Sequence, residues 1–411
     1  MATPPKRGFD EREFHDRCTR IQTKMADADI ELLWLTTEAD ISYITGFQTQ
    51  FWQSPTRPWH VLLPVCGKPV AVIPSIGLPC MQKTWVEDIR TWSSPDPVDD
   101  GVTLLRDAIL ELRGPQARIG FPMGAETHLR YCWHDVNRLR AKLAKASWID
   151  ATDAIRSVRQ IKSTSEIEKI AYVCELTSNA FACVPDIIHS GMCETDAFSA
   201  FKICCLEQGV DTPAYLVGKA QANGYDDIIS PPSDHIISQG DVLILDTGCT
   251  WDGYYADFDR NFAFGSVDRK TAEAHQRVWD ATEATLTTLR PGLTCRDLFH
   301  TLRNSLGSDH ERVGLPTHLA TPSGSDHERV GRPMQNTAVG RFGHGLGLQL
   351  TETPSIMDSD TTELCAGMVI TLEPGYSYAP GKIMVHEENV LITDNGARLL
   401  SRRAPRDIPV I

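Results

Sequence analysis

The chain has 411 residues, of which 41% are hydrophobic, so it is long enough for two domains with sizeable cores. Its 54 acidic residues outnumber its 40 basic ones, and an acidic protein repels phosphate backbones, so no nucleic-acid partner is expected. We also expect neither a membrane span nor a signal peptide, because no apolar stretch is long enough and the N-terminal residues are polar. Twelve scattered cysteines without a Cys-x-x-Cys pair favour reduced thiols and a cytoplasmic location.

The first 155 residues alternate between helix and strand patterns. Apolar residues at helical spacing predict an amphipathic helix over residues 10–29. Strands are then expected at 31–35, 41–44, 60–64, 69–73 and 117–120, and further helices near 101–112 and 127–145. This alternation is typical of an α/β domain, so residues 1–155 are predicted to form one.

Residues 156–411 are predicted to form a second, α+β domain that carries the chemistry. The polar segment 156–165 reads as the connection, and Thr164 or Ser165 can cap the helix that follows. Helices dominate next, strands and turns follow, and a further helix is expected near 270–289.

The octapeptide GSDHERVG occurs twice, at 307–314 and 324–331. A tandem duplication in a surface loop explains the repeat, because loops tolerate insertions at small entropic cost. An extra metal site is the alternative, with these candidate ligands: Asp309, His310, Asp326 and His327.

The segment LDTGCTWDGYYADFDR holds two aspartates eleven positions apart. Asp246 ends an apolar run, and Asp257 follows Asp252-Gly253, a dipeptide that is a strong hairpin signal. We therefore predict that the chain folds back and brings Asp246 opposite Asp257 on neighbouring strands.

Three more polar residues lie in short apolar segments: His344 in RFGHGLGLQL, Glu373 in ITLEPG and Glu387 in VHEENVLIT. A turn rich in proline and glycine separates the two glutamates, which predicts a second hairpin. Four carboxylates within a few Å repel one another and lose hydration, so they predict bound cations. Oxygen ligands with one imidazole suit two divalent ions, such as Mn, Fe, Co or Zn. Such ions make a bridging water nucleophilic near neutral pH, and a metal-bound glutamate can carry the proton.

These segments resemble the pita-bread metallohydrolases, the family of methionine aminopeptidase, prolidase, aminopeptidase P and creatinase. LDTGCTWDGYYADFDRNF, GHGLGLQLTE, TLEPG and HEENVLIT carry the resemblance, and YITGF is similar to the creatinase/prolidase N-terminal domain. The resemblance implies a homodimer in which a pita-bread catalytic domain follows a creatinase-type N-terminal domain. It also implies a metal ligand set: Asp246, Asp257, His344, Glu373 and Glu387. Glu373 and His344 are the expected catalytic residues.

Glu387 and Glu388 are adjacent candidates for the last ligand. Aligning the tail VLIT with the family pattern favours Glu387, and a one-residue shift would turn the side chain to the other face of the strand.

Two positions depart from the family pattern. Its peptidases carry a second histidine seven residues after the ligand histidine, where this chain has Thr351. They also carry a histidine upstream of the first aspartate, and here Tyr225 and Asp226 lie nearest. These histidines bind substrate in the peptidases, so the substrate contacts are predicted to differ, with Asp226 favouring an amine-bearing substrate.

A loop with two tryptophans and an arginine is the other candidate for substrate contact. Arg57 could bind a carboxylate, and Trp52 and Trp59 could stack on a ligand. In dimeric members of the family this loop reaches the partner's active site. Packing at an interface is the alternative for the tryptophans.

Arg260 is a candidate to orient a ligand carboxylate, or else to form a surface salt bridge.

The leading interpretation is a two-metal hydrolase, similar to Xaa-Pro dipeptidases and aminopeptidases. It would cleave a C–N bond of a dipeptide or Xaa-Pro-type substrate with a metal-bridged hydroxide. One alternative is a non-peptidase of the same fold, like creatinase, ectoine hydrolase or dimethylsulfoniopropionate lyase, acting on a small zwitterion. Another is a non-catalytic binding protein, which the retention of all five ligand types disfavours.

Overall fold

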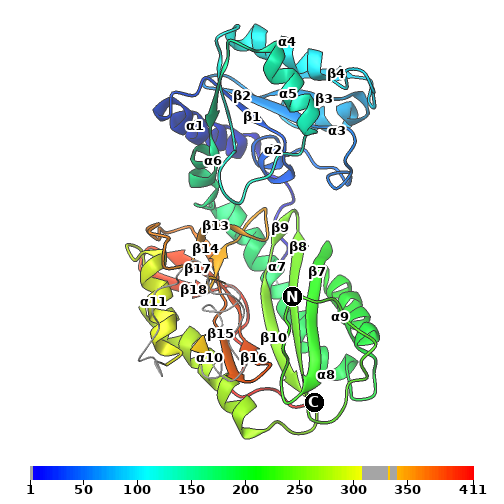
Figure 1. Ribbon diagram of the computed structural model, residues 1–411, viewed down its shortest axis with the longest axis vertical. Helices are drawn as coiled ribbons and strands as arrows, with labels where there is room; N and C mark the ends of the chain where they lie inside the picture. Colours follow the sequence, from blue (N-terminus) through cyan, green and yellow to red (C-terminus); the bar gives the residue numbers. More distant parts are fainter. Residues whose placement is uncertain (1–2, 308–331, 334–339) are drawn as a thin grey trace. The chain divides into compact units, whose positions relative to one another are not determined.

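The computed structural model describes residues 3–307, 332–333 and 340–411 (Figure 1). The duplicated octapeptide and its hypothetical metal site lie outside the described residues, apart from Gly307. The chain forms two compact units: residues 6–159, and residues 160–411 together with residues 1–5. In the described part of the chain, no helix is long and apolar enough to cross a membrane.

The N-terminal unit is an α/β domain built on a six-stranded mixed sheet, as predicted. The strand order is β4-β3-β2-β1-β5-β6. The strands are β1 (Leu32–Leu35), β2 (His60–Pro64), β3 (Val70–Pro74), β4 (Asp88–Trp92), β5 (Arg118–Phe121) and β6 (Ser147–Asp150). The helices are α1 (Glu11–Asp27), α2 (Glu38–Thr45), α3 (Leu78–Met81), α4 (Val102–Arg113), α5 (Trp133–Lys142) and α6 (Thr152–Arg159), with a short 3-10 turn, η1 (Ser75–Gly77).

The strand predicted at residues 41–44 is wrong, because this segment lies within helix α2. The Thr37 hydroxyl accepts a hydrogen bond from the Asp40 amide at the start of the helix. Gly46 ends the helix with φ +75°, a conformation that glycine adopts at no steric cost. A short apolar run fits either element, and here the two caps decided in favour of a helix.

The described residues of the C-terminal unit form three sheets. Strands β7 (Thr212–Ala222), β8 (Asp241–Trp251), β9 (Tyr254–Tyr255) and β10 (Phe258–Ala263) form the first. Strands β13 (Glu352–Ser355), β12 (His344–Gly345), β14 (Val369–Leu372), β17 (Glu388–Thr393) and β18 (Gly396–Leu399) form the second. The third consists of β11 (Arg332–Pro333), β15 (Gly375–Ala379) and β16 (Lys382–Val385).

The helices described in this unit are α7 (Thr164–Ala182), α8 (Val184–Ile187), α9 (Glu194–Gln208), α10 (Arg269–Thr288) and α11 (Cys295–Ser305). Helices α7 and α9 pack on the first sheet, whereas α10 packs on β15, β16 and β18 (Figure 1). Strands β10 and β17 contact each other, so the first and second sheets meet there.

The N-cap of helix α7 lies one residue before Thr164 and two before Ser165, the two predicted caps. Ser163, with extended backbone, is the N-cap, and its hydroxyl accepts from the Glu166 amide at 3.3 Å. The Glu166 carboxylate accepts from the Ser163 amide at 2.9 Å, which completes a capping box. Thr164 is the first helical residue, so the prediction of Thr164 or Ser165 as the cap is wrong.

The predicted hairpin turn at Asp252-Gly253 is confirmed. Both residues have positive φ, +51° and +84°, and Trp251 pairs with Tyr254 across the two-residue turn. The Lys169 ammonium of α7 contacts the Asp252 carboxylate at 2.5 Å, and both side chains are largely buried. This ion pair fixes the hairpin against the helix behind it.

Candidate metal centre

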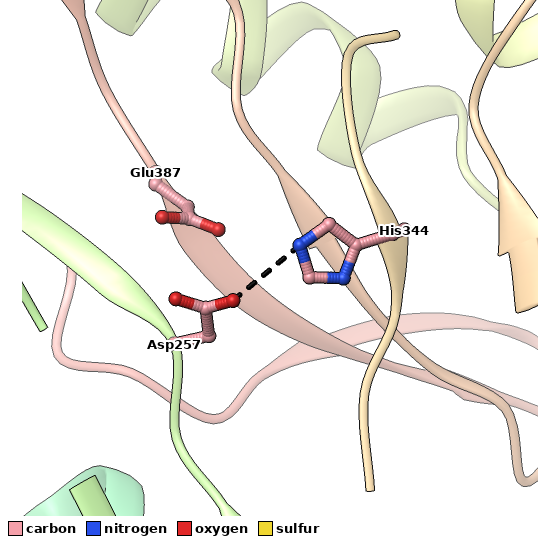
Figure 2. Close-up of side chains that lie close together, drawn as sticks. All are labelled: Asp257, His344 and Glu387. Atoms are coloured by element: carbon pink, nitrogen blue, oxygen red, sulfur yellow. Dashed lines mark ion pairs between the residues drawn. The ribbon is translucent and has the colours of Figure 1, made fainter. Parts of the chain in front are cut away.

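Three of the predicted ligands meet at one point between the first two sheets. Figure 2 shows the carboxylates of Asp257 and Glu387 turned toward the His344 ring. One ligand atom from each lies within 4.8 Å of the others, and His344 Nε2 is 3.4 Å from Asp257 Oδ2. All three are buried, with 3% to 4% of their surface exposed. Two carboxylates and an imidazole in this arrangement suit a divalent cation.

The His344 ring is held with one nitrogen free to bind a metal. Its Nδ1 lies 2.9 Å from the Gly345 carbonyl, which can only accept a hydrogen bond. Nδ1 therefore carries the proton, and Nε2 presents its lone pair to the carboxylates.

Asp246 and Asp257 lie on the same face of the first sheet but are not directly opposite each other. The two-residue turn fixes the register of the hairpin, in which Asp246 pairs with Asp259. Asp257 precedes Asp259 by two residues along the chain. Side chains two residues apart share a face, so Asp257 is the diagonal neighbour of Asp246. The prediction of direct opposition is wrong by two residues.

The two glutamates lie across from each other at the ends of β14 and β17. Leu372 pairs with Glu388 in this ladder, so its continuation brings Glu373 opposite Glu387. Glu373 Oε1 is 3.6 Å from His344 Nε2. One strand was predicted to run through Glu387, but the structure has two strands there, β16 before Glu387 and β17 after it. They belong to different sheets, because β16 pairs with β15 and β17 pairs with β14.

Two carboxylate oxygens of the cluster fit the binding of metal. Among the described residues, Glu373 Oε1 and Glu387 Oε1 are buried and find no hydrogen-bond partner. Leaving a buried carboxylate oxygen without a partner is costly, and a coordinated cation removes that cost. The donor set therefore fits divalent metal.

Burial and mutual repulsion shift the pKa values of the cluster. Burial raises the pKa of Asp246 to about 6 and that of Glu373 to about 7. It also raises the pKa of Asp257 and Glu387 well above the usual range, and the neighbouring carboxylates add to the shift. Burial lowers the pKa of His344 to about 4. Without a cation the cluster holds protons, and a bound cation favours the ionised carboxylates instead.

Tyr215 of β7 joins the site, although no sequence motif marks it. Its hydroxyl donates to Asp246 Oδ1 at 2.7 Å and also lies against Asp257 Oδ1. This phenol links the two aspartates from the neighbouring strand. It lies 31 residues before Asp246 and could be found only from the pairing of β7 with β8.

The structure distinguishes the two adjacent candidates, Glu387 and Glu388, by the surroundings of their side chains. Glu388 faces away from the metal cluster, where its carboxylate contacts Arg260 at 3.0 Å and Arg403 and His386 at 3.2 Å each. Burial raises the pKa of Glu388, but the Arg260 charge and the His386 hydrogen bond outweigh it and leave the pKa below its usual range. Arg260 also donates to the Glu387 carbonyl at 3.0 Å, so it holds the backbone of a ligand residue.

The residues predicted to replace the missing upstream histidine lie in different surroundings. Tyr225 is fully buried, and its hydroxyl donates to Asn261 Oδ1 at 2.7 Å. Asp226 is exposed and forms an ion pair with Lys219 at 2.7 Å. Full burial of Tyr225 weighs against direct contact with a substrate, whereas Asp226 is accessible.

Thr351 contacts an arginine that borders the cluster. Arg341 Nη2 donates to the Thr351 hydroxyl at 3.5 Å, and Arg341 Nε is 3.8 Å from Glu373 Oε1. The side chains of Arg341 and Glu373 remain 23% and 19% exposed, so they mark the accessible side of the cluster. No sequence motif pointed to Arg341, although it lies only three residues before His344.

Trp52, Arg57 and Trp59 lie in the N-terminal unit. Trp52 is 7% exposed and Trp59 is 2% exposed, and both rings contact Phe47. The guanidinium of Arg130 donates to five backbone carbonyls of residues 51–57. This loop is therefore held in one conformation, with its tryptophans packed inside the unit.

The fold and the site together define a metal-dependent hydrolase of the pita-bread type. Residues 168–394 match the model of metallopeptidase family M24, and residues 17–161 match the creatinase/prolidase N-terminal domain. The chain belongs to metallopeptidase family M24. Membership implies divalent metal ions in the site and a peptidase substrate.

Relatives and solved structures agree with this assignment. The chain is 28% identical to the Xaa-Pro dipeptidase of Pyrococcus horikoshii over 284 residues, covering 68% of this chain and 73% of the relative. It is 24% identical to the probable dipeptidase PepE of Mycobacterium tuberculosis over 410 residues, covering 98% of both chains. The fold matches dipeptidase PepE from Mycobacterium ulcerans with a TM-score of 0.79 at 23% identity, covering 98% of this chain and 99% of that one. It matches prolidase from Thermococcus sibiricus with a TM-score of 0.82 at 20% identity, covering 98% and 100%. These relatives do not favour the non-peptidase alternative.

Proposed function

We propose that this chain is a dipeptidase that uses two divalent metal ions to hydrolyse the peptide bond of Xaa-Pro or related dipeptides. The observation that carries the proposal is the convergence of Asp257, His344 and Glu387 within 4.8 Å, with Glu373 and Asp246 beside them. The relatives named as dipeptidases support the choice of substrate.

Five residues would hold the metals: Asp246, Asp257, His344, Glu373 and Glu387. Bound Mn, Fe, Co or Zn ions would supply an activated water and polarise the scissile carbonyl. The carboxylate of Glu373, at the accessible side of the cluster, would take the proton from the attacking water and pass it to the leaving amine. His344 would hold its ligand nitrogen fixed through the hydrogen bond to Gly345, and Tyr215 would keep Asp246 and Asp257 aligned.

Substrate recognition is proposed for residues around this centre. Thr351 has the best support, because Arg341 connects it to Glu373. Asp226 is accessible for an amine group. Contacts from Arg57, Trp52 and Trp59 are proposed on the family resemblance alone, and Tyr225 would act through the packing beneath the site.

We further infer a cytoplasmic homodimer that has neither a nucleic-acid nor a membrane partner. The acidic composition and the free cysteines support the location and the lack of a nucleic-acid partner. The homodimer rests on the family resemblance.

Metal analysis and peptide hydrolysis test the proposed function. Purified protein supplied with Mn²⁺ or Co²⁺ should bind about two ions per chain and cleave Xaa-Pro dipeptides faster than tripeptides or dipeptide amides. Asp257→Asn should lower kcat/KM on the order of 10³-fold or more because a ligand is lost. Asp280→Asn, which changes a surface carboxylate paired with Arg406, is the matched control and should leave activity unchanged. Metal-loaded protein that cleaves no dipeptide would overturn the proposal.

A further inference from the structure

Side-chain hydrogen bonds connect the two sheets that carry the metal ligands. Asp257 comes directly before β10 in the first sheet, and Glu387 comes directly before β17 in the second. Among the strands that the structure describes, these sheets share no strand-to-strand ladder. The distance between the two ligands therefore depends on contacts that cross from one sheet to the other. Among them are a backbone hydrogen bond from the Tyr255 amide to the Gly347 carbonyl and several side-chain hydrogen bonds.

Asn389 of β17 makes the crossing contact at Asp257. The Asp257 amide donates to Asn389 Oδ1 at 2.9 Å, and Asn389 Nδ2 donates to the Asp257 carbonyl. One side-chain amide thus binds the peptide groups on both sides of the Asp257 Cα atom. Asn389 is itself fully buried, and the Cys174 thiol donates to its Oδ1 at 3.3 Å.

Because Asn389 contacts Asp257 at two points, it fixes the direction of the Asp257 side chain as well as its position. Holding both peptide groups restricts φ and ψ of Asp257 and so sets the direction of its Cα–Cβ bond toward His344. Without the amide, two buried backbone groups would lack partners, which costs about 1–3 kcal/mol each, so the segment would shift to satisfy them. Asn389 lies two residues after Glu387, so one short segment at the start of β17 provides both a ligand and the support for a ligand of the other sheet.

We propose that Asn389 is a positioning residue for metal binding, whose amide aims the Asp257 carboxylate from the opposite sheet. The inference rests on the part of the proposed function that makes Asp257 a metal ligand. It requires no particular substrate. Partners of metal ligands usually change metal affinity by 10- to 100-fold when they are removed.

Asn261 provides a matched control in the same region. It is also a buried asparagine, 3% exposed, and its Nδ2 donates to the Val385 carbonyl at 2.8 Å. Its Oδ1 accepts from the Tyr225 hydroxyl. It therefore makes the same kind of contact between sheets, but with no predicted metal ligand. Both asparagines stabilise the fold, and only Asn389 should affect the metal.

The test titrates metal-free protein with Co²⁺ and follows the visible absorption of the bound ion. Asn389→Leu should raise the dissociation constant of at least one Co²⁺ ion by roughly 10- to 100-fold and change its spectrum. Asn261→Leu should shift the constant by less than about threefold while lowering the melting temperature to a similar extent. Asn389→Ser and Asn261→Ser repeat the comparison with smaller side chains in case the leucine variants fail to fold.

An unchanged Co²⁺ affinity in the Asn389 variants would overturn the inference, as would an equal loss in the Asn261 variants. The readout is independent of peptide hydrolysis. Wild-type protein that binds Co²⁺ but cleaves no dipeptide would overturn the proposed substrate and still allow the role of Asn389 to be measured.

Discussion

Replacing Glu373 by glutamine should stabilise the metal-free protein at pH 8 and destabilise the metal-loaded protein. In the metal-free fold, burial raises the pKa of Glu373 from 4.5 to about 7. A carboxyl group whose pKa is raised by folding favours the folded state below its unfolded pKa. That contribution is lost as the pH rises through the folded pKa. Ionised Glu373 therefore opposes folding at pH 8, and the neutral amide does not.

The size of the effect follows from the two pKa values. A rise from 4.5 to about 7 corresponds to about 3 kcal/mol at 25 °C. The Glu373 side chain keeps 19% of its surface exposed, so solvent screens part of this electrostatic free energy. We therefore expect Glu373→Gln to raise the free energy of unfolding of the metal-free protein by about 2–3 kcal/mol at pH 8. At pH 5 the difference between Glu373→Gln and wild type should fall below about 1 kcal/mol, because the buried group is then protonated.

Differential scanning calorimetry of chelator-treated protein at pH 5 and pH 8 measures this difference. Comparing variant with wild type cancels the opposing effect of His344. Burial lowers the pKa of His344 to about 4, so its contribution to stability is lost as the pH falls below the unfolded pKa of about 6.5. With saturating Mn²⁺ the order should reverse, because wild type keeps a ligand that the variant lacks. A metal-free variant less stable than wild type at pH 8 would refute the electrostatic reasoning.

Three further predictions concern the supports of the fold. Lys169→Met should lower the free energy of unfolding by about 3 kcal/mol, because it removes the ammonium group that contacts the largely buried Asp252 carboxylate. Calorimetry of the double variant, which adds Asp252→Asn, should show that most of this loss is recovered. Arg130→Met should make the loop 51–57 roughly tenfold more susceptible to limited proteolysis, since five carbonyl contacts are lost, and an unchanged cleavage rate would contradict this. Ser163→Ala should cost about 1 kcal/mol by removing the cap of α7, whereas Ser163→Asp should cost less in the same urea titration.

Local patterns were enough to predict most of the elements and the metal ligand candidates. The Asp252-Gly253 signal predicted its hairpin because a tight turn depends on the φ values of two adjacent residues. Helix α2 was missed because a short apolar run fits a strand and a helix equally well, and the capping contacts of Thr37 and Gly46 decided between them. The register around Asp257 also depended on the length of the turn, which fixes which residues pair.

The sequence by itself determined the class of chemistry, since four carboxylates and one histidine in short apolar segments have few stable arrangements without cations. Only the tertiary structure decided how these residues are held. Tyr215, Arg341 and Asn389 each contact a ligand that is distant from them in sequence, namely Asp246, Glu373 and Asp257. Such contacts leave no periodic pattern in a single chain, because they depend on how the sheets pack against each other.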